Sequence, residues 1–584
     1  MRLIVVLLAV LLVPVPVAGA VVDDTAVHVR AGKFRDDQGR EVTLRGFTVS
    51  GTAKLAENRG LPFATTADAS RSARAMKQLT GANSARFPIT WAWVEPEPGR
   101  IDHAYLDRVT EQISAFTDEG ILVYLDFHQD LYSRYLFNAD SWYTGDGAPA
   151  WVVRAGGYPR ESCGLCVHWG QNMKSNRAVT DATYDFWHNR EITTSAGPRK
   201  IRDAFLNQAG ETLRHLKANL SASAFRLVLG VDPINEPYAG RYDGGQTSLT
   251  WERDLLWPFY QRFRAVMDTE GWGNKAAFVE PLVFWNQNVE SFAEPGGLTE
   301  VPGLGDRYVF NSHFYDGKAQ SGILKPGKAN DGEYAADFRR IADRATALGT
   351  TSIVSEFGHP IAGYTSDKTP TILKAIHQSL DSRLSGADWW ARPASSGPAL
   401  SGSQWHWDVN YGRHHELMND NPNKVKTDGD AMNDEHFSAV RLDDAGTPLL
   451  TVDSRLVDRL YPLAVAGDTV AFTYEDLARD GSTTLSWNRV PTTMPAVRAL
   501  VGSGQYGVLV WRSTSGAPTE LHLPRSFQTT TVVSDAEATV VGDRLLLNGS
   551  DGLHHALIAG TASSPEQRAA AAVELRDWVG RTNP

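Results

Sequence analysis

The sequence predicts a (β/α)₈ barrel followed by a C-terminal β-sandwich, and three observations indicate this fold class. Between residues 43 and 408, eight short apolar segments alternate with stretches of helical periodicity. Polar residues gather at the C-terminal end of nearly every apolar segment, as expected where the strand ends of a barrel face one cleft. After about residue 463 the pattern changes to short alternating runs that suit a sandwich. A doubly wound open sheet is the alternative, but no Gly-x-Gly-x-x-Gly turn follows the first segment.

The eight segments are expected to be the barrel strands. They cover residues 43–50, 82–89, 121–128, 225–234, 277–285, 307–314, 352–357 and 403–408. Residues 103–119 show the helical pattern between them, because Leu106, Val109, Ile113 and Phe116 recur at helical spacing before Gly120, which fits a helix stop. Upstream, residues 27–44 alternate around Asp37-Gln38-Gly39 and predict a hairpin that closes the floor of the barrel.

The N-terminus has the composition of a signal peptide. One arginine precedes an apolar run that ends in Ala18-Gly19-Ala20, a small-residue cleavage pattern. The run contains prolines and is too short for a comfortable membrane span, although an uncleaved anchor is the alternative. We therefore expect residues 1–20 to be a signal peptide of an exported, extracellular protein. Residues 21–462 would then form the barrel domain, and 463–584 the sandwich with a terminal helix.

Charge and cysteine content exclude several classes of partner. The formal net charge of −11, without a long basic run, argues against a nucleic-acid partner. The two cysteines, Cys163 and Cys166, are half of a zinc site with no second pair to complete it. In an exported protein a local disulfide between them is the better interpretation. The sequence thus predicts no metal, no cofactor and no obligate protein partner.

Two glutamates at strand ends carry the main functional signal. Glu236 follows the fourth strand in "VDPINEPYAG", and Glu356 ends the seventh in "IVSEFGHP". Two carboxyl groups that face each other across a small-molecule cleft can cleave a glycosidic bond, provided that one holds a proton and the other is ionised. A single glutamate at a strand end is more often an ordinary surface acid, so the pair depends on its surroundings for support.

Other strand ends supply those surroundings. The residues are Arg86 after the second strand, His128, Gln129 and Asp130 after the third, Asn235 beside Glu236, His313 and Tyr315 after the sixth, and Trp405 at the eighth. Each one alone has a structural interpretation, such as a surface ion pair, a core histidine or barrel packing. Their occurrence at the same end of successive strands indicates one binding site.

The motif "NEP" together with Arg86, "HFY" and "SEFG" resembles family 5 of the glycoside hydrolases, within clan A of the retaining glycosidases. Four stretches resemble endoglycoceramidases and their glycolipid-cleaving relatives in particular, and the resemblance extends over nearly the whole mature chain. They are "LRGFTVSGTAK" (44–54), "SARFPITWAWVEPEPGRIDHAYLDRV" (84–109), "VYLDFHQDLYS" (123–133) and "LVDRLYPLAVAGD" (456–468).

The resemblance implies a role for each matching residue. Glu236 would be the acid/base and Glu356 the nucleophile. Asn235 would bind the 2-hydroxyl of the sugar, and Tyr315 would hold the nucleophile. The supporting shell would consist of Arg86, His128 and His313, whereas Lys54, Asp130 and Trp405 would hold the sugar next to the ceramide.

The expected function is that of a retaining β-glycosidase that cleaves glycolipids between glycan and lipid, releasing ceramide, at a micelle or membrane surface. Three alternatives remain: an exo-acting glucosylceramidase or steryl β-glucosidase, a β-glucanase, and a non-catalytic carbohydrate-binding barrel. The loops 129–200 and 386–445 are long enough to build or cover a site, and we expect an apolar wall for the lipid from Trp142, Trp151, Trp389 and Trp390. The segment 135–176 and the surroundings "SEFGHP" and "QWHWDVNYGRHHE" depart from the endoglycoceramidase pattern, and these loops bear on how many sugars fit.

Overall fold

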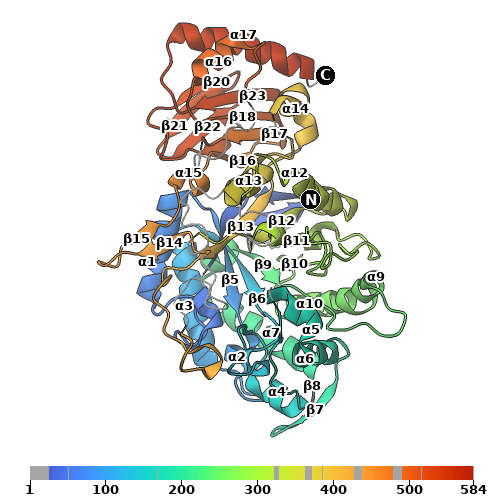
Figure 1. Cartoon of the computed structure of the whole chain (residues 1–584). Helices are drawn as coiled ribbons and strands as arrows, with labels where there is room; N and C mark the ends of the chain where they lie inside the picture. Colours follow the sequence, from blue (N-terminus) through green and yellow to red (C-terminus); the bar gives the residue numbers. More distant parts are fainter. Residues whose placement is uncertain are drawn as a thin grey trace, which may run out of the picture.

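The computed structural model describes residues 25–49, 51–166, 169–320, 328–361, 371–384, 386–425, 437–477, 489–514 and 516–582. It shows a barrel with antiparallel sheets packed at one end (Figure 1). The expected signal peptide, residues 1–20, lies outside the described residues. Among the residues described, no helix has the length and apolar character needed to cross a bilayer.

Eight parallel strands close into the barrel, which confirms the predicted fold class. In barrel order they are β4 (Arg45–Val49), β5 (Ser84–Ile89), β6 (Leu122–Phe127), β9 (Val228–Asp232), β10 (Ala276–Val279), β11 (Tyr308–Phe314), β12 (Ser352–Phe357) and β13 (Ser401–Trp407). The principal surrounding helices are α1 (Thr66–Thr80), α3 (His103–Asp118), α7 (Ile201–Asn219), α10 (Trp257–Thr269), α12 (Ala335–Ala347) and α13 (Thr371–Asp381). Each expected strand overlaps an observed one.

Local capping interactions determine where the helices begin and end. The Asp102 side chain accepts a hydrogen bond from the Tyr105 amide and starts α3, and Thr65 does the same for α1 through the Asp68 amide. Helix α1 ends at Gly81, whose φ of 63° is the left-handed conformation that glycine adopts readily. The apolar stripe of α3 is buried as predicted, including Leu106 and Ile113.

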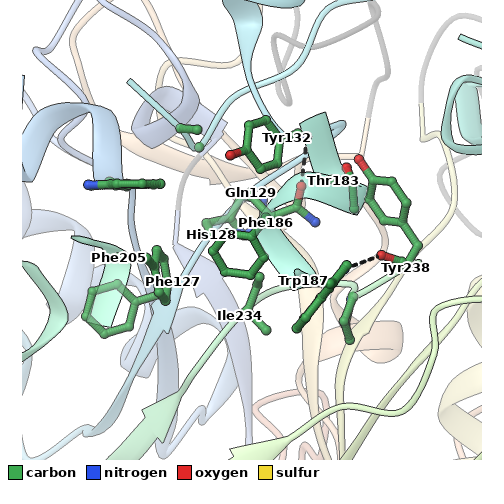
Figure 2. Close-up of a pocket in the computed structure, with 14 residues that line it drawn as sticks. Phe127, His128, Gln129, Tyr132, Thr183, Phe186, Trp187, Phe205, Ile234 and Tyr238 are labelled. Carbon is green, nitrogen blue, oxygen red and sulfur yellow. Dashed lines mark hydrogen bonds between the residues drawn. The ribbon is translucent and has the colours of Figure 1, made fainter. Parts of the chain in front are cut away.

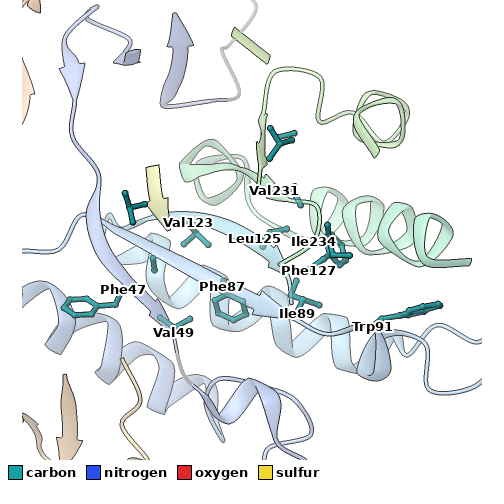
Figure 3. Packing of buried hydrophobic residues seen from close by; sticks show 14 of the residues in the cluster. Phe47, Val49, Phe87, Ile89, Trp91, Val123, Leu125, Phe127, Val231 and Ile234 are labelled. Carbon is teal, nitrogen blue, oxygen red and sulfur yellow. The ribbon is translucent and has the colours of Figure 1, made fainter. Parts of the chain in front are cut away.

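Alternation along the barrel strands separates packing from chemistry. On β5 and β6, side chains such as Phe87, Ile89 and Leu125 belong to the apolar cluster shared with the surrounding helices (Figure 3). The intervening positions, among them Arg86 and Asp126, form buried contacts with residues of other barrel strands. Since successive strand residues point to opposite faces, the outward positions stabilise the helical layer while the inward ones remain free to build a site.

The floor of the barrel is closed by three strands rather than by one hairpin. Strands β1 (Val27–Arg30), β2 (Lys33–Asp36) and β3 (Glu41–Val42) are joined by two turns, and the predicted turn around Asp37-Gln38-Gly39 is the second of them. Their apolar residues pack against the lower interior of the barrel, where Phe34 stacks on Phe278 at 6.4 Å between ring centroids. The same strands also form one edge of a C-terminal sheet, which the sequence analysis did not anticipate.

The C-terminal region is a sandwich of two antiparallel sheets. The first contains β1 to β3 with β16 (Tyr461–Val465), β19 (Thr519–His522), β22 (Arg544–Asn548) and β21 (Glu537–Val541). The second contains β17 (Asp468–Glu475), β18 (Tyr506–Ser513), β23 (Gly552–Ala559) and β20 (Thr531–Ser534). The outer face of the second sheet is covered by α16 (Pro495–Val501) and the terminal helix α17 (Pro565–Thr582). The boundary proposed between residues 462 and 463 falls inside β16. One of the short alternating runs expected in the sandwich, residues 483–487, lies outside the described residues.

The long segment after β6 is folded around several short elements. They are η2 (Arg134–Leu136), α4 (Ala150–Gly156), η3 (Trp169–Gln171), α5 (Asn172–Ser175), α6 (Arg177–Trp187) and the hairpin β7 (Glu191–Thr194) and β8 (Gly197–Lys200). Within it, Cys163 and Cys166 form a disulfide with their Cα atoms 5.5 Å apart. The second long segment contributes α14 (Gly386–Ala391), η6 (Pro393–Ser396), and β14 (Val440–Leu442) paired with β15 (Pro448–Leu450).

Candidate active site

The two predicted glutamates face each other at the C-terminal end of the barrel. Glu236 lies in the turn that follows β9, and Glu356 lies near the end of β12. One carboxylate oxygen of each residue and a ring nitrogen of His313 all lie within 4.8 Å of one another. Both side chains are largely buried, so each carboxyl group depends on protein neighbours for its protonation state.

Arg86 is the centre of the charged network beneath the pair. Its Nη1 donates to Glu356, and its Nη2 lies 2.8 Å from Asp232 Oδ2 and 2.9 Å from Asn235 Oδ1. The guanidinium is fully buried, with Asp126 Oδ1 also at 3.1 Å from Nη2. A planar fork with several fixed donors can span these acceptors at once, which a single ammonium cannot.

Glu280, which was not among the predicted site residues, contacts three of the key groups. Its Oε2 accepts a hydrogen bond from the Glu236 amide at 3.1 Å, and its Oε1 lies 3.3 Å from Arg86 Nη2 and 3.2 Å from His313 Nε2. The predicted strand 277–285 hid this residue, because the apolar run continues through "PLVFW" whereas β10 ends at Val279. An acid directly after an apolar strand is the signal that could have found it.

The backbone at Glu236 is held in an uncommon conformation. Its φ is +42°, in the left-handed region that non-glycine residues rarely occupy. The Gln129 side chain donates to Asn235 O at 2.8 Å and to Glu236 O at 3.3 Å, and the Asn235 side chain donates back to Gln129 O at 3.0 Å. Such strain persists only where the surroundings over-determine it, and here they aim the Glu236 side chain into the cleft.

His313 and Tyr315 connect the two glutamates. His313 Nδ1 lies 2.9 Å from Glu236 Oε1 and 3.6 Å from Glu356 Oε2, while its Nε2 is 3.0 Å from Ser355 Oγ. The Tyr315 hydroxyl donates to Glu356 Oε2 at 3.0 Å. Each glutamate is therefore fixed by a ring from β11 or from the segment just after it.

The environments of the two glutamates push their pKa values apart. Burial raises the pKa of Glu236 above its usual range, against the opposing effect of the His313 hydrogen bond. Burial acts in the same direction on Glu356, but the charges of His313 and Arg86 outweigh it and lower the pKa of that carboxyl. His313 is held as a cation, because Glu280 and Glu356 overcome its burial and raise its pKa well above the usual value. One carboxyl is thus prepared to donate a proton and the other to remain ionised.

A second group of predicted residues lies beside the glutamates. Lys54 Nζ lies 2.5 Å from Asp130 Oδ2 and 4.0 Å from the centroid of the Trp405 ring. His128 Nδ1 lies 2.7 Å from Asp126 Oδ2, and its Nε2 lies 3.1 Å from Asp130 Oδ2. The His128 ring also stacks on the Trp405 ring. Since Asp126 also contacts Arg86, this group and the glutamates belong to one continuous network.

Asp146 is a further buried carboxyl that the sequence analysis did not single out. Its Oδ1 accepts a hydrogen bond from the Asp130 amide at 3.0 Å. Burial and the neighbouring Asp130 charge raise the pKa of Asp146 to about 6. The extended loop after β6 therefore contributes a titratable group beside Asp130.

Two clusters among the described residues have the spacing of metal ligands: His128 with Asp130 and Asp146, and His313 with Glu236 and Glu356. In the first, the Lys54 ammonium already pairs with Asp130, and in the second, Arg86 pairs with Glu356. Because each cluster already contacts a protein cation, a metal ion bound there would be repelled by that positive charge. The donor set therefore fits protein ion pairs better than a bound metal ion.

The expected tryptophan wall is largely wrong. Trp389 and Trp390 precede β13 and are buried against Trp578 of α17, with ring centroids 5.6 and 5.0 Å from it, at the sandwich. Trp151 is buried against Trp91 and donates to Glu95 O. Only Trp142, with 62% of its surface exposed, remains available for contact. Apolar surface that anchors domains and helices has the same composition as a lipid wall, so residue type alone did not separate them.

An apolar pocket lies behind the site, between the ends of β6 and β9 and the helices α6 and α7 (Figure 2). Aromatic and aliphatic side chains form most of its lining, including Phe186, Trp187, Phe205 and Ile234, and His128 of the charged network also lines it. The Trp187 indole donates to Tyr238 O at 2.7 Å and closes one side. These packed side chains line the pocket together with Gln129 after β6 and Pro237 after β9, and so support the two loops that hold Glu236.

A family model described as cellulase (glycosyl hydrolase family 5) matches residues 36–188. Endoglycoceramidase I of Rhodococcus hoagii is 27% identical over 339 residues, covering 53% of this chain and 57% of that protein. A glucosylceramidase of Aspergillus fumigatus is 33% identical over 152 residues, covering 23% of this chain and 19% of that protein. The chain therefore spans little more than half of the first relative and about a fifth of the second.

Among solved structures, endo-glycoceramidase II from Rhodococcus sp. in a ganglioside GM3 complex superposes with a TM-score of 0.60 at 21% identity, covering 91% of this chain and 100% of that one. At this identity the likeness shows the shared fold. The resemblance to glycoside hydrolase family 5 is confirmed over residues 36–188.

Proposed function

We propose that this protein is a retaining β-glycosidase that hydrolyses glycolipids at the bond between glycan and lipid. The observation that carries the mechanism is the pair Glu236 and Glu356, with oxygens within 4.8 Å and pKa values displaced in opposite directions. Carboxyl groups about 5–5.5 Å apart suit a retaining enzyme, whereas inverting enzymes need about 6.5–9.5 Å to admit a water molecule. The glycolipid substrate rests on the relatives, whose names are endoglycoceramidase and glucosylceramidase.

The proposed reaction has two steps. Ionised Glu356 attacks the anomeric carbon while protonated Glu236 delivers its proton to the oxygen that leaves with the lipid. His313 Nδ1 is hydrogen-bonded to Glu236 Oε1, so the other carboxyl oxygen, Oε2, carries the proton that is transferred. Glu236 then removes a proton from water, which cleaves the glycosyl ester on Glu356 and regenerates both groups.

Product analysis tests the substrate assignment. Micellar glucosylceramide, lactosylceramide and a ganglioside would be incubated with the protein and separated by thin-layer chromatography, with Glu356→Gln as the matched control. Release of an intact oligosaccharide with ceramide supports endo action. Release of glucose from glucosylceramide alone would instead support an exo-acting glucosylceramidase, the alternative that the similarity to the Aspergillus enzyme favours. No release from any glycolipid would contradict the proposal.

The lipid should contribute strongly to turnover. Each methylene buried against the protein contributes about 0.8 kcal/mol, so four of them would favour a glycolipid over a methyl glycoside by roughly 200-fold in kcat/KM. The measurement compares lactosylceramide with methyl β-lactoside. A soluble cello-oligosaccharide cleaved as efficiently as the glycolipid would favour a β-glucanase, the alternative to which the cellulase family model points.

The pH dependence should follow the two displaced pKa values. The kcat/KM should rise as Glu356 ionises, below the usual glutamate pKa of about 4.3, and fall as Glu236 loses its proton above that value. The two limbs belong to the coupled pair rather than to either residue alone. On an aryl glycoside, Glu236→Gln should lose the basic limb and keep the acidic one. Loss of the acidic limb instead would reverse the assignment.

We also propose that the protein is exported, on the basis of the predicted leader at residues 1–20 and the disulfide between Cys163 and Cys166. N-terminal sequencing of protein from the culture medium should find a start near Val21. Recovery of the full-length chain only from cells would contradict this.

A further inference from the structure

A buried chain of ion pairs joins the barrel to the sandwich, at the opposite end of the barrel from the glutamates. Arg45 at the start of β4 donates to Asp381 Oδ1 at 3.0 Å, at the end of α13. Arg459, just before β16, donates to Asp381 Oδ2 at 2.5 Å and to Asp476 Oδ2 at 2.7 Å. In Figure 1, α13 and β16 lie where the two domains meet.

A cavity lies within this chain. Most of its lining is apolar, from residues such as Phe47, Phe357 and Val457. Its charged lining consists of Arg45, Arg459 and Asp381, two cations against one anion. Asp476 neutralises part of the Arg459 charge, but from a position that does not line the cavity.

Several polar groups on the cavity lining lack partners among the described residues. They are Nε and Nη1 of Arg45, Nε of Arg459 and Nδ1 of His377. Arg459 is only 5% exposed and His377 7%, so solvent does not reach these atoms freely. A guanidinium has no acceptor of its own, and its unpaired donors are costly in an apolar setting.

His377 does not supply the missing charge. Burial, together with the charges of Arg459 and Arg45, lowers its pKa well below the usual value, so the ring is neutral. Its Nε2 lies 3.1 Å from Gln404 Oε1, and the Gln404 Nε2 has no partner where it stands. If the side-chain amide of Gln404 is flipped, its Nε2 donates to His377 Nε2 and no hydrogen bond is lost. The proton of the neutral His377 ring then lies on Nδ1, which becomes a donor toward the cavity.

We propose that this cavity binds a small monovalent anion with the size and charge of chloride. The anion accepts hydrogen bonds from the unpaired donors of Arg45, Arg459 and His377 on the lining. It bridges β4 and α13 of the barrel to the segment that enters the sandwich. Its effect is on the stability of the domain junction, because the cavity contains none of the residues of the candidate active site.

Thermal unfolding of the full chain tests this in calorimetric scans at one ionic strength, with sodium gluconate replaced stepwise by sodium chloride. We expect the midpoint to rise saturably by about 1–3 °C in chloride, with bromide substituting for it. General screening would act equally in both salts. Crystals grown in sodium bromide should show an anomalous peak between Arg45 and Arg459.

A matched pair of variants locates the effect. Arg45→Gln leaves one cation and one anion on the cavity and should abolish the difference between chloride and gluconate. Arg262→Gln removes an exposed arginine that pairs with Asp203 at 2.6 Å and should keep the difference. If Arg45→Gln does not fold, the halide titration and the bromide peak of the unaltered protein still decide. Equal midpoints in both salts without a bromide peak would show that water fills the cavity and overturn the proposal.

Discussion

Replacing Glu356 with glutamine should reduce kcat by about 10⁴-fold or more, on every substrate. The amide cannot attack the anomeric carbon, so no glycosyl ester forms, however good the leaving group is. Arg86 and Tyr315 both contact this carboxylate, and their donors would face a group that accepts less strongly. Burst kinetics and mass spectrometry with a 2-fluoro aryl glycoside would measure the loss of both turnover and labelling.

The matched variant Glu236→Gln should behave differently, because it removes the proton donor and not the nucleophile. General acid–base catalysis contributes about 10²–10⁴-fold, so natural glycolipids should suffer by that factor while activated aryl glycosides form the glycosyl ester nearly normally. Azide should then release a β-glycosyl azide of retained configuration, since an anion needs no base. If azide gives an α-glycosyl azide with Glu236→Gln, or if only the Glu356 variant is rescued with retention, the roles are exchanged.

Much of the fold could be predicted because each barrel strand is short, apolar and followed by polar residues. Residues 121–128 illustrate this: Val123, Leu125 and Phe127 face the helices, while Asp126 and His128 join the charged network. The apolar positions that pack against the helices and the polar positions that build the site therefore occur together in one stretch of sequence, so both could be predicted from it. The terminal helix expected after the sandwich is also present, as α17.

The parts that escaped prediction depend on contacts between distant segments. Nothing within residues 27–42 indicates that β3 pairs with β16, more than 400 residues later. Trp389 and Trp390 could line a cleft or anchor a helix, and only the position of Trp578 shows which they do. Glu280 was hidden because the apolar run passes beyond the true end of β10.

Arg86 should be as important as the glutamates, for a different reason. Its guanidinium contacts Asp126, Asp232, Glu280 and Glu356, all of them buried. Removing one partner of a buried charge pair leaves the other uncompensated and lowers the free energy of unfolding by about 3–5 kcal/mol. We therefore expect Arg86→Met to be poorly soluble, which makes Arg86→Lys the more informative variant.

Arg86→Lys keeps the positive charge but loses the fork. One ammonium cannot hold Glu356 through one nitrogen and Asp232 and Asn235 through another, so the nucleophile should lose its orientation and part of its ionisation. We expect kcat to fall by about 10²–10³-fold with a smaller change in KM, because a 1 Å misplacement of a reacting group alone can cost about 10²-fold. The acidic limb of the pH profile should shift upward, because Glu356 loses its hydrogen bond from the Arg86 fork and the shorter ammonium lies farther from it, although the charge of His313 remains. Arg262→Lys, an exposed arginine, serves as the control, and an unshifted acidic limb with near-normal kcat would show that Arg86 only supports the fold.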